Sequence, residues 1–94
     1  MCTRKEQVLM HLAETNRGAY RDVMPFGTTQ DGIADSVGIS RSHVSIVLKQ
    51  LEADGMVFHE MRVASGSKIH RRCYRLMPYG WMAARELIAE QEAM

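Results

Sequence analysis

The first pattern along the chain is that of an amphipathic helix. Thr3 and Glu6 have the spacing of a reciprocal helix cap, in which each side chain accepts a hydrogen bond from the backbone of the other residue. Asn16 and Gly18 are residues that end helices. The apolar positions between these signals recur at helical spacing and predict one buried face: Val8, Leu9, Leu12 and Ala13.

Two shorter amphipathic segments follow in the middle of the chain, separated by a turn of about four residues. Thr29 is the expected cap of the first, which has Asp31 in its first turn and ends at Gly38. Ser40 is the expected cap of the second. Their predicted buried faces are Ile33, Ala34 and Val37, then Val44, Val47, Leu48 and Leu51. This arrangement predicts a helix-turn-helix over about residues 29–54.

An irregular stretch lies between the first helix and this pair. Pro25 and Gly27 break regular structure there. We expect Met24 and Phe26 to form a very short strand at the edge of a sheet.

After residue 55 the spacing changes from helical to alternating. Residues 56–63 and 69–76 predict two strands, because a five-residue polar loop with a glycine joins them. One face of the second strand carries His70, Arg72, Tyr74 and Leu76, and the other carries Arg71, Cys73 and Arg75. We expect a hairpin over about residues 56–76 that is anchored in the core by one face only.

A last helix is predicted over about residues 78–92. Pro78 suits its first turn, where the missing N–H costs nothing. The apolar stripe of this helix consists of Trp81, Ala84, Leu87 and Ile88. It caps the core, pairs with the same helix of a second copy, or does both, so these four residues are the candidate interface of a homodimer.

Length and composition restrict the class of protein. The chain has 94 residues, 46% of them hydrophobic and 24% charged, which predicts a single folded domain over residues 1–94. No apolar run is long enough to cross a bilayer, so we expect a cytoplasmic protein without membrane contact. Cys2 and Cys73 are too few for a disulfide framework and are expected to be free thiols.

The charge is unevenly distributed. The net charge is only +1, yet residues 59–75 carry five Lys and Arg side chains against Glu60, a net charge of +4. A concentrated basic segment is typical of a contact with a polyanion, although a solvated charged hairpin has the same composition. The side chains expected to contact DNA backbone or minor groove are Arg62, Lys68, Arg71 and Arg72.

The outward face of the third helix is short and polar. It consists of Ser42, Ser45, Ile46 and Lys49, preceded by Arg41 at the positive end of the helix. Such a face suits insertion into a major groove, where Arg reads guanine and small side chains meet base edges and thymine methyls. A solvated helix face is the alternative. His43 is a candidate phosphate donor or an ordinary surface residue, and Thr29, Gln30 and Ser40 complete the candidate DNA-binding set.

Other chemistry has weaker support. A metal-responsive protein would use the four histidines and two cysteines, but His70 and Cys73 point to opposite faces of a strand and no Cys-x-x-Cys pair exists. We find no glycine-rich phosphate loop, paired carboxylates or nucleophile with a base at a recognisable interval, so neither an enzyme nor a cofactor is expected.

Three runs of residues carry a family resemblance: residues 29–34 (TQDGIA), 38–45 (GISRSHVS) and 48–57 (LKQLEADGMV). They resemble winged helix-turn-helix domains of the MarR/ArsR-like kind, especially an archaeal group of transcriptional regulators, and the similarity extends over about residues 3–88. In that group the residue before the proline of the last helix is usually Thr, whereas here it is Met77.

The resemblance implies a mainly α fold with a small β-hairpin as its wing. It also implies binding of double-stranded DNA through the third helix and the wing, and often a homodimer. The alternatives left open are an adaptor module that binds protein rather than DNA, and a ligand-responsive or metal-responsive sensor.

Overall fold

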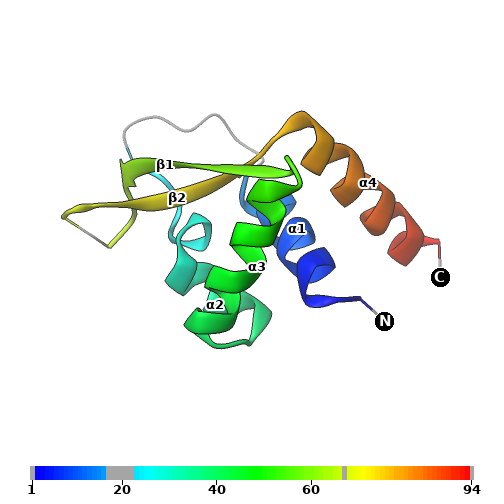
Figure 1. The fold of residues 1–94 in the computed structure, drawn as a ribbon, viewed down its shortest axis with the longest axis horizontal. Coiled ribbons are helices and arrows are strands. Elements are labelled where there is room, and N and C mark those ends of the chain that lie inside the picture. The colour runs from blue at the N-terminus through cyan, green and yellow to red at the C-terminus, as the bar shows by residue number, and fades with distance from the viewer. Residues whose placement is uncertain (1, 17–22, 67, 94) are drawn as a thin grey trace.

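Four α-helices and a two-stranded hairpin make up the computed structural model, which describes residues 2–16, 23–66 and 68–93 (Figure 1). The order along the chain is α1 (Arg4–Thr15), a 3-10 turn (Phe26–Thr28), α2 (Gln30–Val37), α3 (Arg41–Ala53), β1 (Val57–Val63), β2 (His70–Leu76) and α4 (Pro78–Glu92). This confirms the predicted fold class, a mainly α winged helix-turn-helix.

Local signals begin three of the helices as the sequence predicts. The Thr3 hydroxyl accepts from the Glu6 backbone N–H, and the Glu6 carboxylate accepts from that of Thr3 at 2.8 Å. The hydroxyls of Thr29 and Ser40 each accept from the backbone N–H three residues later, which caps α2 and α3. Helix α4 begins at Pro78 without a side-chain cap, in agreement with the absence of a hydroxyl at Met77.

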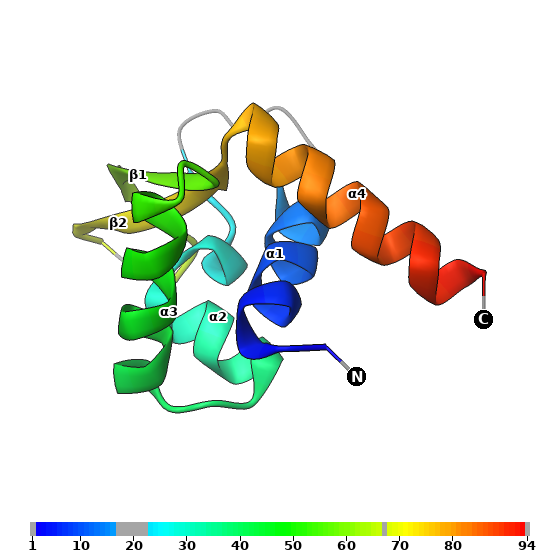
Figure 2. The same ribbon diagram turned by 45° about the vertical axis from the view of Figure 1, so that its right-hand side comes forward.

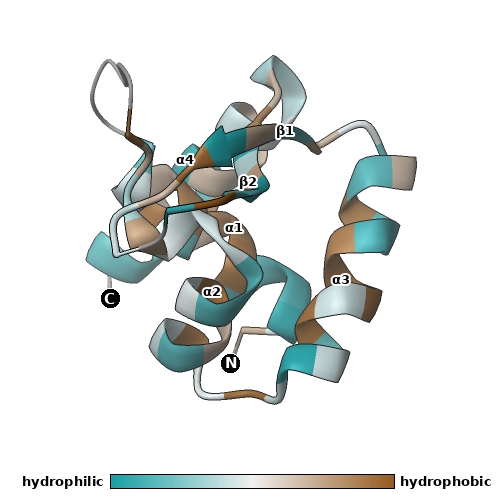
Figure 3. Ribbon diagram, turned by 90° about the vertical axis from the view of Figure 1, so that its left-hand side faces the viewer, coloured by the Kyte–Doolittle hydropathy of each residue, from teal (hydrophilic) through white to brown (hydrophobic). Residues whose placement is uncertain are grey.

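The core lies where the first three helices meet the root of the hairpin. The predicted apolar faces of α1 and α3 are buried, together with Ile33 and Ala34 of α2. Hydrophobic and hydrophilic stretches alternate along α3, as expected for a helix with one buried face (Figure 3). Helix α4 packs along α1 and buries Ala84 completely, and Trp81, Leu87 and Ile88 pack against the same core.

The hairpin and the C-terminal end of α4 project at opposite ends of the molecule (Figures 1 and 2). The two strands are antiparallel, with Val57 opposite Leu76 and Val63 opposite His70. Each strand therefore begins one residue later than predicted. The root lies against the helices, and the tip extends beyond them.

The prediction that only one face of the hairpin is anchored was wrong. Tyr74 enters the main core as expected, but Cys73 on the opposite face is also buried, against Met24 and Ala64. The segment before α2 supplies this second cover, since the Met24 carbonyl accepts from the Ser65 N–H and its N–H donates to Val63, both at 2.8 Å. The alternation within a strand does not reveal which distant segment will cover its second face.

The expected strand pair at Met24 and Phe26 is half correct. Met24 forms an isolated parallel bridge with Ala64. Phe26 begins the 3-10 turn instead, in which the N–H and the hydroxyl of Thr28 both donate to the Pro25 carbonyl. This local turn competes with pairing to a neighbouring strand, and it directs the chain into α2.

Asn16 has a second role beyond ending α1. Its amide oxygen Oδ1 accepts a hydrogen bond of 3.0 Å from the Leu76 backbone N–H, and both residues are buried. The bond ties the end of the first helix to the end of the last strand, 60 residues later. A buried N–H without a partner is costly, so this contact holds the hairpin root to α1.

Replacing Asn16 by Ala is expected to lower the free energy of unfolding by about 1–3 kcal/mol, because the Leu76 N–H loses its acceptor inside the protein. Urea denaturation followed by circular dichroism measures the change. The control, Gln50→Ala on the exposed face of α3, should stay within about 0.5 kcal/mol of the parent. Equal stability of the two variants would contradict this role for Asn16.

Candidate nucleic-acid interface

The outward face of α3 is exposed as the sequence predicts. Ser42, Ile46 and Lys49 are exposed, and Ser45 is half-buried. Ile46 leaves 57% of its surface open to solvent, so an apolar side chain is available for contact on this face. His43 is exposed beside the helix start, where its backbone N–H is already bonded to Ser40.

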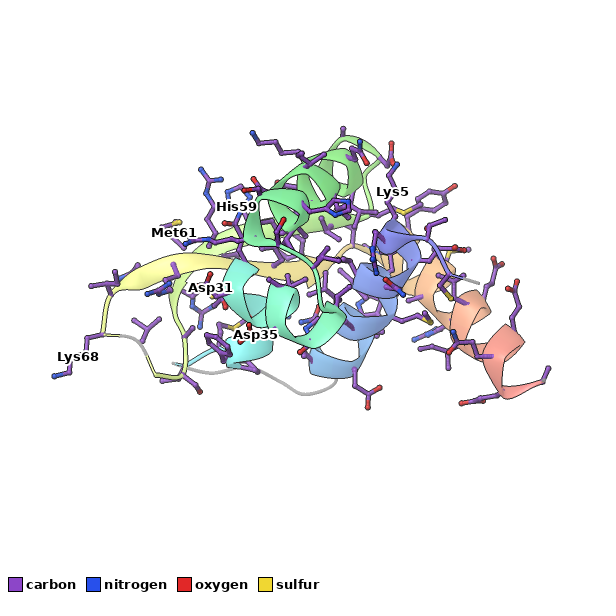
Figure 4. The ribbon with its side chains drawn as sticks, turned by 90° about the horizontal axis from the view of Figure 1, so that it is seen from below. Lys5, Asp31, Asp35, His59, Met61 and Lys68 are labelled. Carbon is purple, nitrogen blue, oxygen red and sulfur yellow. The ribbon has the colours of Figure 1, made fainter. Side chains whose placement is uncertain are left out.

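The candidate cations follow the hairpin from its tip toward its root. Lys68 is at the tip (Figure 4), Arg62 and Arg71 lie directly opposite each other on the two strands, and exposed Arg72 is one residue closer to the root. Like charges in directly opposed positions destabilise a sheet. Carboxylates partly offset the repulsion, at 3.7 Å from Arg62 to Glu60 and at 3.4 Å from Arg71 to Asp31.

Asp31 links the two parts of the candidate interface. One carboxylate oxygen lies 3.3 Å from Nε of Arg41, the first residue of α3, and the other lies 3.4 Å from Nη1 of Arg71 on β2. Asp31 lies beside the hairpin, while Asp35 lies farther along α2 (Figure 4). Helix α3 and the hairpin therefore meet at one acidic side chain of α2.

Two adjoining hollows open along this junction. The first, of about 400 Å³, is lined by Thr29, Gln30, Asp31, Arg41, Ile69, Arg71 and Arg72. The second, of about 490 Å³, is lined by Gln30, Arg41, Ser42, Ser45 and Ile46. Because Gln30 and Arg41 line both, the hollows join the hairpin to the outward face of α3. Three arginines against one aspartate make the first hollow positive, which favours an anionic occupant.

The structure gives the remaining candidates different positions. Thr29 is only 2% exposed, and its hydroxyl donates to the Phe26 carbonyl and accepts from the Gly32 N–H, so its side chain serves the turn before α2. Gln30 donates from Nε2 to the Tyr74 hydroxyl at 3.4 Å, which connects the start of α2 to the hairpin.

Sequence reasoning missed Asp31 and Ile69 as members of this surface. Asp31 was interpreted only through its favourable position in the first turn of α2, which explains a carboxylate there without any distant partner. Ile69 lies before β2 and is 63% exposed beside the arginines. Two arginines that flank an acid in space are separated by 30 residues in sequence, so no local spacing reveals them.

A second set of contacts fixes the hairpin to α3. His59 of β1 lies 2.9 Å from the Glu52 carboxylate of α3, measured from its ring Nδ1. The same ring lies 5.5 Å from the Tyr74 ring, centroid to centroid. The hairpin is thus in contact with α2 through Asp31 and with α3 through Glu52.

The described residues contain neither a metal-binding cluster nor a membrane-spanning helix. Within residues 2–16, 23–66 and 68–93, no group of three or more His, Cys, Asp or Glu side chains is arranged to hold a metal ion. Over the same part of the chain, none of the helices has the length and apolar character that spanning a membrane requires.

Comparison with known families agrees with this geometry. The Crp-like helix-turn-helix domain matches residues 6–65, which include α1, α2, α3 and β1. The chain belongs to this family. No curated protein matches the sequence.

Solved structures share the fold over the whole length of the domain. The Staphylococcus aureus MepR–DNA complex gives a TM-score of 0.75 at 17% identity, over 100% of this chain and 59% of MepR. Lactococcus lactis ZitR, a zinc-responsive MarR family member, gives 0.70 at 22% identity, over 99% and 55%. A protein from Ralstonia eutropha JMP134 gives 0.68 at 22% identity, over 93% and 96%. The chain thus spans about three fifths of the length of the MepR structures.

The buried Cys73 provides a test of how firmly the segment before α2 covers the hairpin. In the folded protein a thiol reagent should modify Cys2, which is partly exposed, much faster than Cys73, which is 0% exposed. Met24→Ala removes the cover of Cys73 and should speed its modification by roughly tenfold or more through local opening. The rate is measured in a Cys2→Ser background, with Met82→Ala at an exposed position as control. Equal rates for the two thiols in the unaltered protein would contradict the burial of the Cys73 side chain.

Proposed function

We propose that this chain is a transcriptional regulator of the MarR/ArsR-like kind that binds specific sequences of double-stranded DNA. Residues 41–50 of α3 enter the major groove, and the hairpin lies along the backbone or in the minor groove. The observation that carries the proposal is the positive junction between α3 and the hairpin, because a duplex that enters the α3 face also meets the arginines of the hairpin.

The shape and chemistry of α3 support the groove assignment. A major groove of roughly 12 Å admits one α-helix, and short side chains let the helix approach the base edges closely. Ser42 and Ser45 provide hydroxyls that donate or accept, and exposed Ile46 offers an apolar contact to thymine methyls. Arg41 begins the helix with 64% of its side chain exposed. This face therefore combines the side-chain types that read bases.

The hairpin supports a contact with the phosphate backbone. The directly opposed Arg62 and Arg71 repel one another, and a phosphate between them would attract both guanidinium groups and offset that repulsion. Lys68 extends this cationic surface to the tip. Four phosphate contacts per copy, from Arg62, Lys68, Arg71 and Arg72, would give a slope of about −3.6 in log K against log salt concentration.

The comparisons support the same function at a coarser level. A Crp-like helix-turn-helix domain and a fold shared with MepR, which was crystallised with DNA, both favour a DNA-binding transcription regulator. Arg41, Ser42, Ser45, Ile46 and Lys49 remain our proposed base-contacting set. His43, Gln30 and Ser40 are proposed to approach phosphates at its edge.

Replacing Arg41 by Ala is expected to weaken binding to a selected site by about 1–3 kcal/mol and to relax sequence preference at one position, because Arg41 is proposed to read a base. Replacing Lys68 by Ala should weaken binding to all sequences alike and reduce the salt slope by about 1. Sites selected from a random oligonucleotide pool, followed by titration at two or more salt concentrations, provide the measurement.

These two variants serve as controls for each other, since each removes one cation from the proposed interface. Equal losses on every sequence would show that Arg41 does not specify a base. An adaptor module would give a different result again, because the unaltered protein would show no salt-dependent binding to any DNA.

We also propose that the chain forms a homodimer through α4. The helix extends away from the body of the molecule (Figure 2), and Trp81, Leu87 and Ile88 are only partly buried along its contact with α1. Ala84 is fully buried within its own chain, where its small side chain lets α1 and α4 approach closely. The proposed contact with a second copy is therefore made by the other three residues of the stripe. Two copies related by a two-fold axis would present two recognition helices to a palindromic site.

Replacing Leu87 by Glu is expected to shift the mass of the protein from dimer to monomer, because the added charge would lie on the apolar stripe of α4 through which the two copies are proposed to meet. Light scattering after size exclusion at micromolar concentration measures the mass. Ile46→Glu makes a closely similar change on the exposed α3 face and should leave the mass unchanged. A monomeric parent protein would count against the dimer.

A further inference from the structure

Asp31 is an unexpected residue on a surface proposed to meet DNA. Its carboxylate lines the hollow between the hairpin and α3, where every other charged side chain is an arginine. A negative charge at this position repels phosphates and lowers affinity for DNA of any sequence. Exposed ion pairs also stabilise folded proteins only slightly, and the three side chains that meet here are 37–64% exposed. The position of Asp31 in the first turn of α2 explains why a carboxylate is favourable there, but it does not explain the contacts of that carboxylate with two arginines.

The atoms that make the contact suggest another role. Asp31 approaches Arg41 at Nε, at 3.3 Å, rather than at the terminal nitrogens. This contact does not occupy Nη1 or Nη2, the end of the guanidinium that points away from the backbone. A carboxylate beside Nε limits the conformations open to the long Arg41 side chain and leaves its two terminal nitrogens available.

We propose that Asp31 is a positioning residue that holds Arg41 end-on for a guanine in the major groove. The inference rests on the proposed function, since it concerns the same surface. Two terminal N–H groups in a fixed plane match the N7 and O6 acceptors of guanine, which is the commonest specific contact of arginine with DNA. Restriction of a long side chain before binding also reduces the entropy lost when it contacts a base.

The second contact of Asp31 extends the proposal to the hairpin. Its other oxygen lies 3.4 Å from Nη1 of Arg71, which is on the strand proposed to follow the DNA backbone. When Arg71 contacts a phosphate, the position of Arg71 constrains the Asp31 carboxylate. That carboxylate in turn constrains the guanidinium of Arg41. Base reading by α3 and backbone contact by the hairpin are therefore coupled through one carboxylate, and substitutions of Arg41 and Arg71 should not have additive effects.

Asp31→Asn tests the proposal, because it keeps the size of the side chain and removes its charge. The probe is a selected duplex in which each guanine is replaced in turn by 7-deazaguanine, which lacks the N7 acceptor. In the unaltered protein one such replacement should weaken binding by about tenfold, and Arg41→Ala should abolish the difference. In Asp31→Asn the difference should fall to about twofold, while affinity for non-specific DNA at low salt rises.

Asp35→Asn is the matched control. Asp35 is exposed on the same helix four residues later, so its removal makes the same change in net charge without touching Arg41 or Arg71. It should raise non-specific affinity slightly and leave the discrimination at about tenfold. A purely structural role for Asp31 predicts the opposite pattern, with a lower melting temperature and a parallel loss of affinity for both probes.

The double variant completes the test. Asp31→Asn added to Arg41→Ala should cause no further loss of affinity for the selected duplex, since both changes act through the same guanidinium. Independent, additive losses of this affinity would overturn the proposal, as would full discrimination in Asp31→Asn alone. Asp31→Glu, which keeps the charge, should retain part of the discrimination and guards against a variant that fails through poor folding.

The result also separates this inference from the function on which it rests. If the unaltered protein binds no DNA, the proposed function fails. If it binds and discriminates through Arg41 but is indifferent to Asp31, only the positioning role fails.

Discussion

The arrangement of this protein depends on burial of the hairpin on both faces. Tyr74 enters the main core from one side of β2, and the adjacent Cys73 is covered by Met24 and Ala64 on the other. A two-stranded hairpin is marginal by itself in water, so these contacts hold it in place. Because both faces of the hairpin are held, it projects in a defined direction relative to α3. The direction of the hairpin in turn determines which of its side chains lie beside α3.

The candidate interface combines charges that would be unfavourable in isolation. Arg62 and Arg71 oppose each other across the strands, and Asp31 lies among arginines. Their exposed ion pairs contribute little to stability, so they can be rearranged at small cost when a polyanion arrives. Surfaces with this property suit binding, because the ligand supplies the interactions that the free protein lacks. Stability is provided elsewhere, by the apolar faces of α1 and α3.

Helix α4 shows how one element can serve both the fold and an assembly. Ala84 is completely buried against the domain, while Tyr79 and Met82 on the same helix are each 60% exposed. A small domain buries a limited fraction of its surface, so a long helix at its edge has apolar area left over. The stripe predicted from sequence therefore contributes to the core of one chain, and its exposed margin supports the proposed dimer.

The elements were predictable because their signals are local. Reciprocal capping by Thr3 and Glu6, the caps at Thr29 and Ser40, and the apolar spacing of α3 each involve residues within one or two helical turns. Such signals favour the same elements wherever they occur in a sequence, and here they agree with the four helices and the hairpin of the fold. The exposed face of α3 could be predicted in the same way, since it is the complement of the buried one.

The contacts between elements could not be predicted, because each joins side chains that are distant in sequence. Asn16 bonds to the backbone of Leu76, Met24 covers Cys73, and Asp31 meets Arg71. Their partners lie 40 to 60 residues away, and only the packed core brings them within reach. The amino-acid sequence by itself determined which segments become helices and strands and which faces are apolar. The tertiary structure decided how the hairpin and α3 are joined, since the angle between them depends on packing that no local pattern contains.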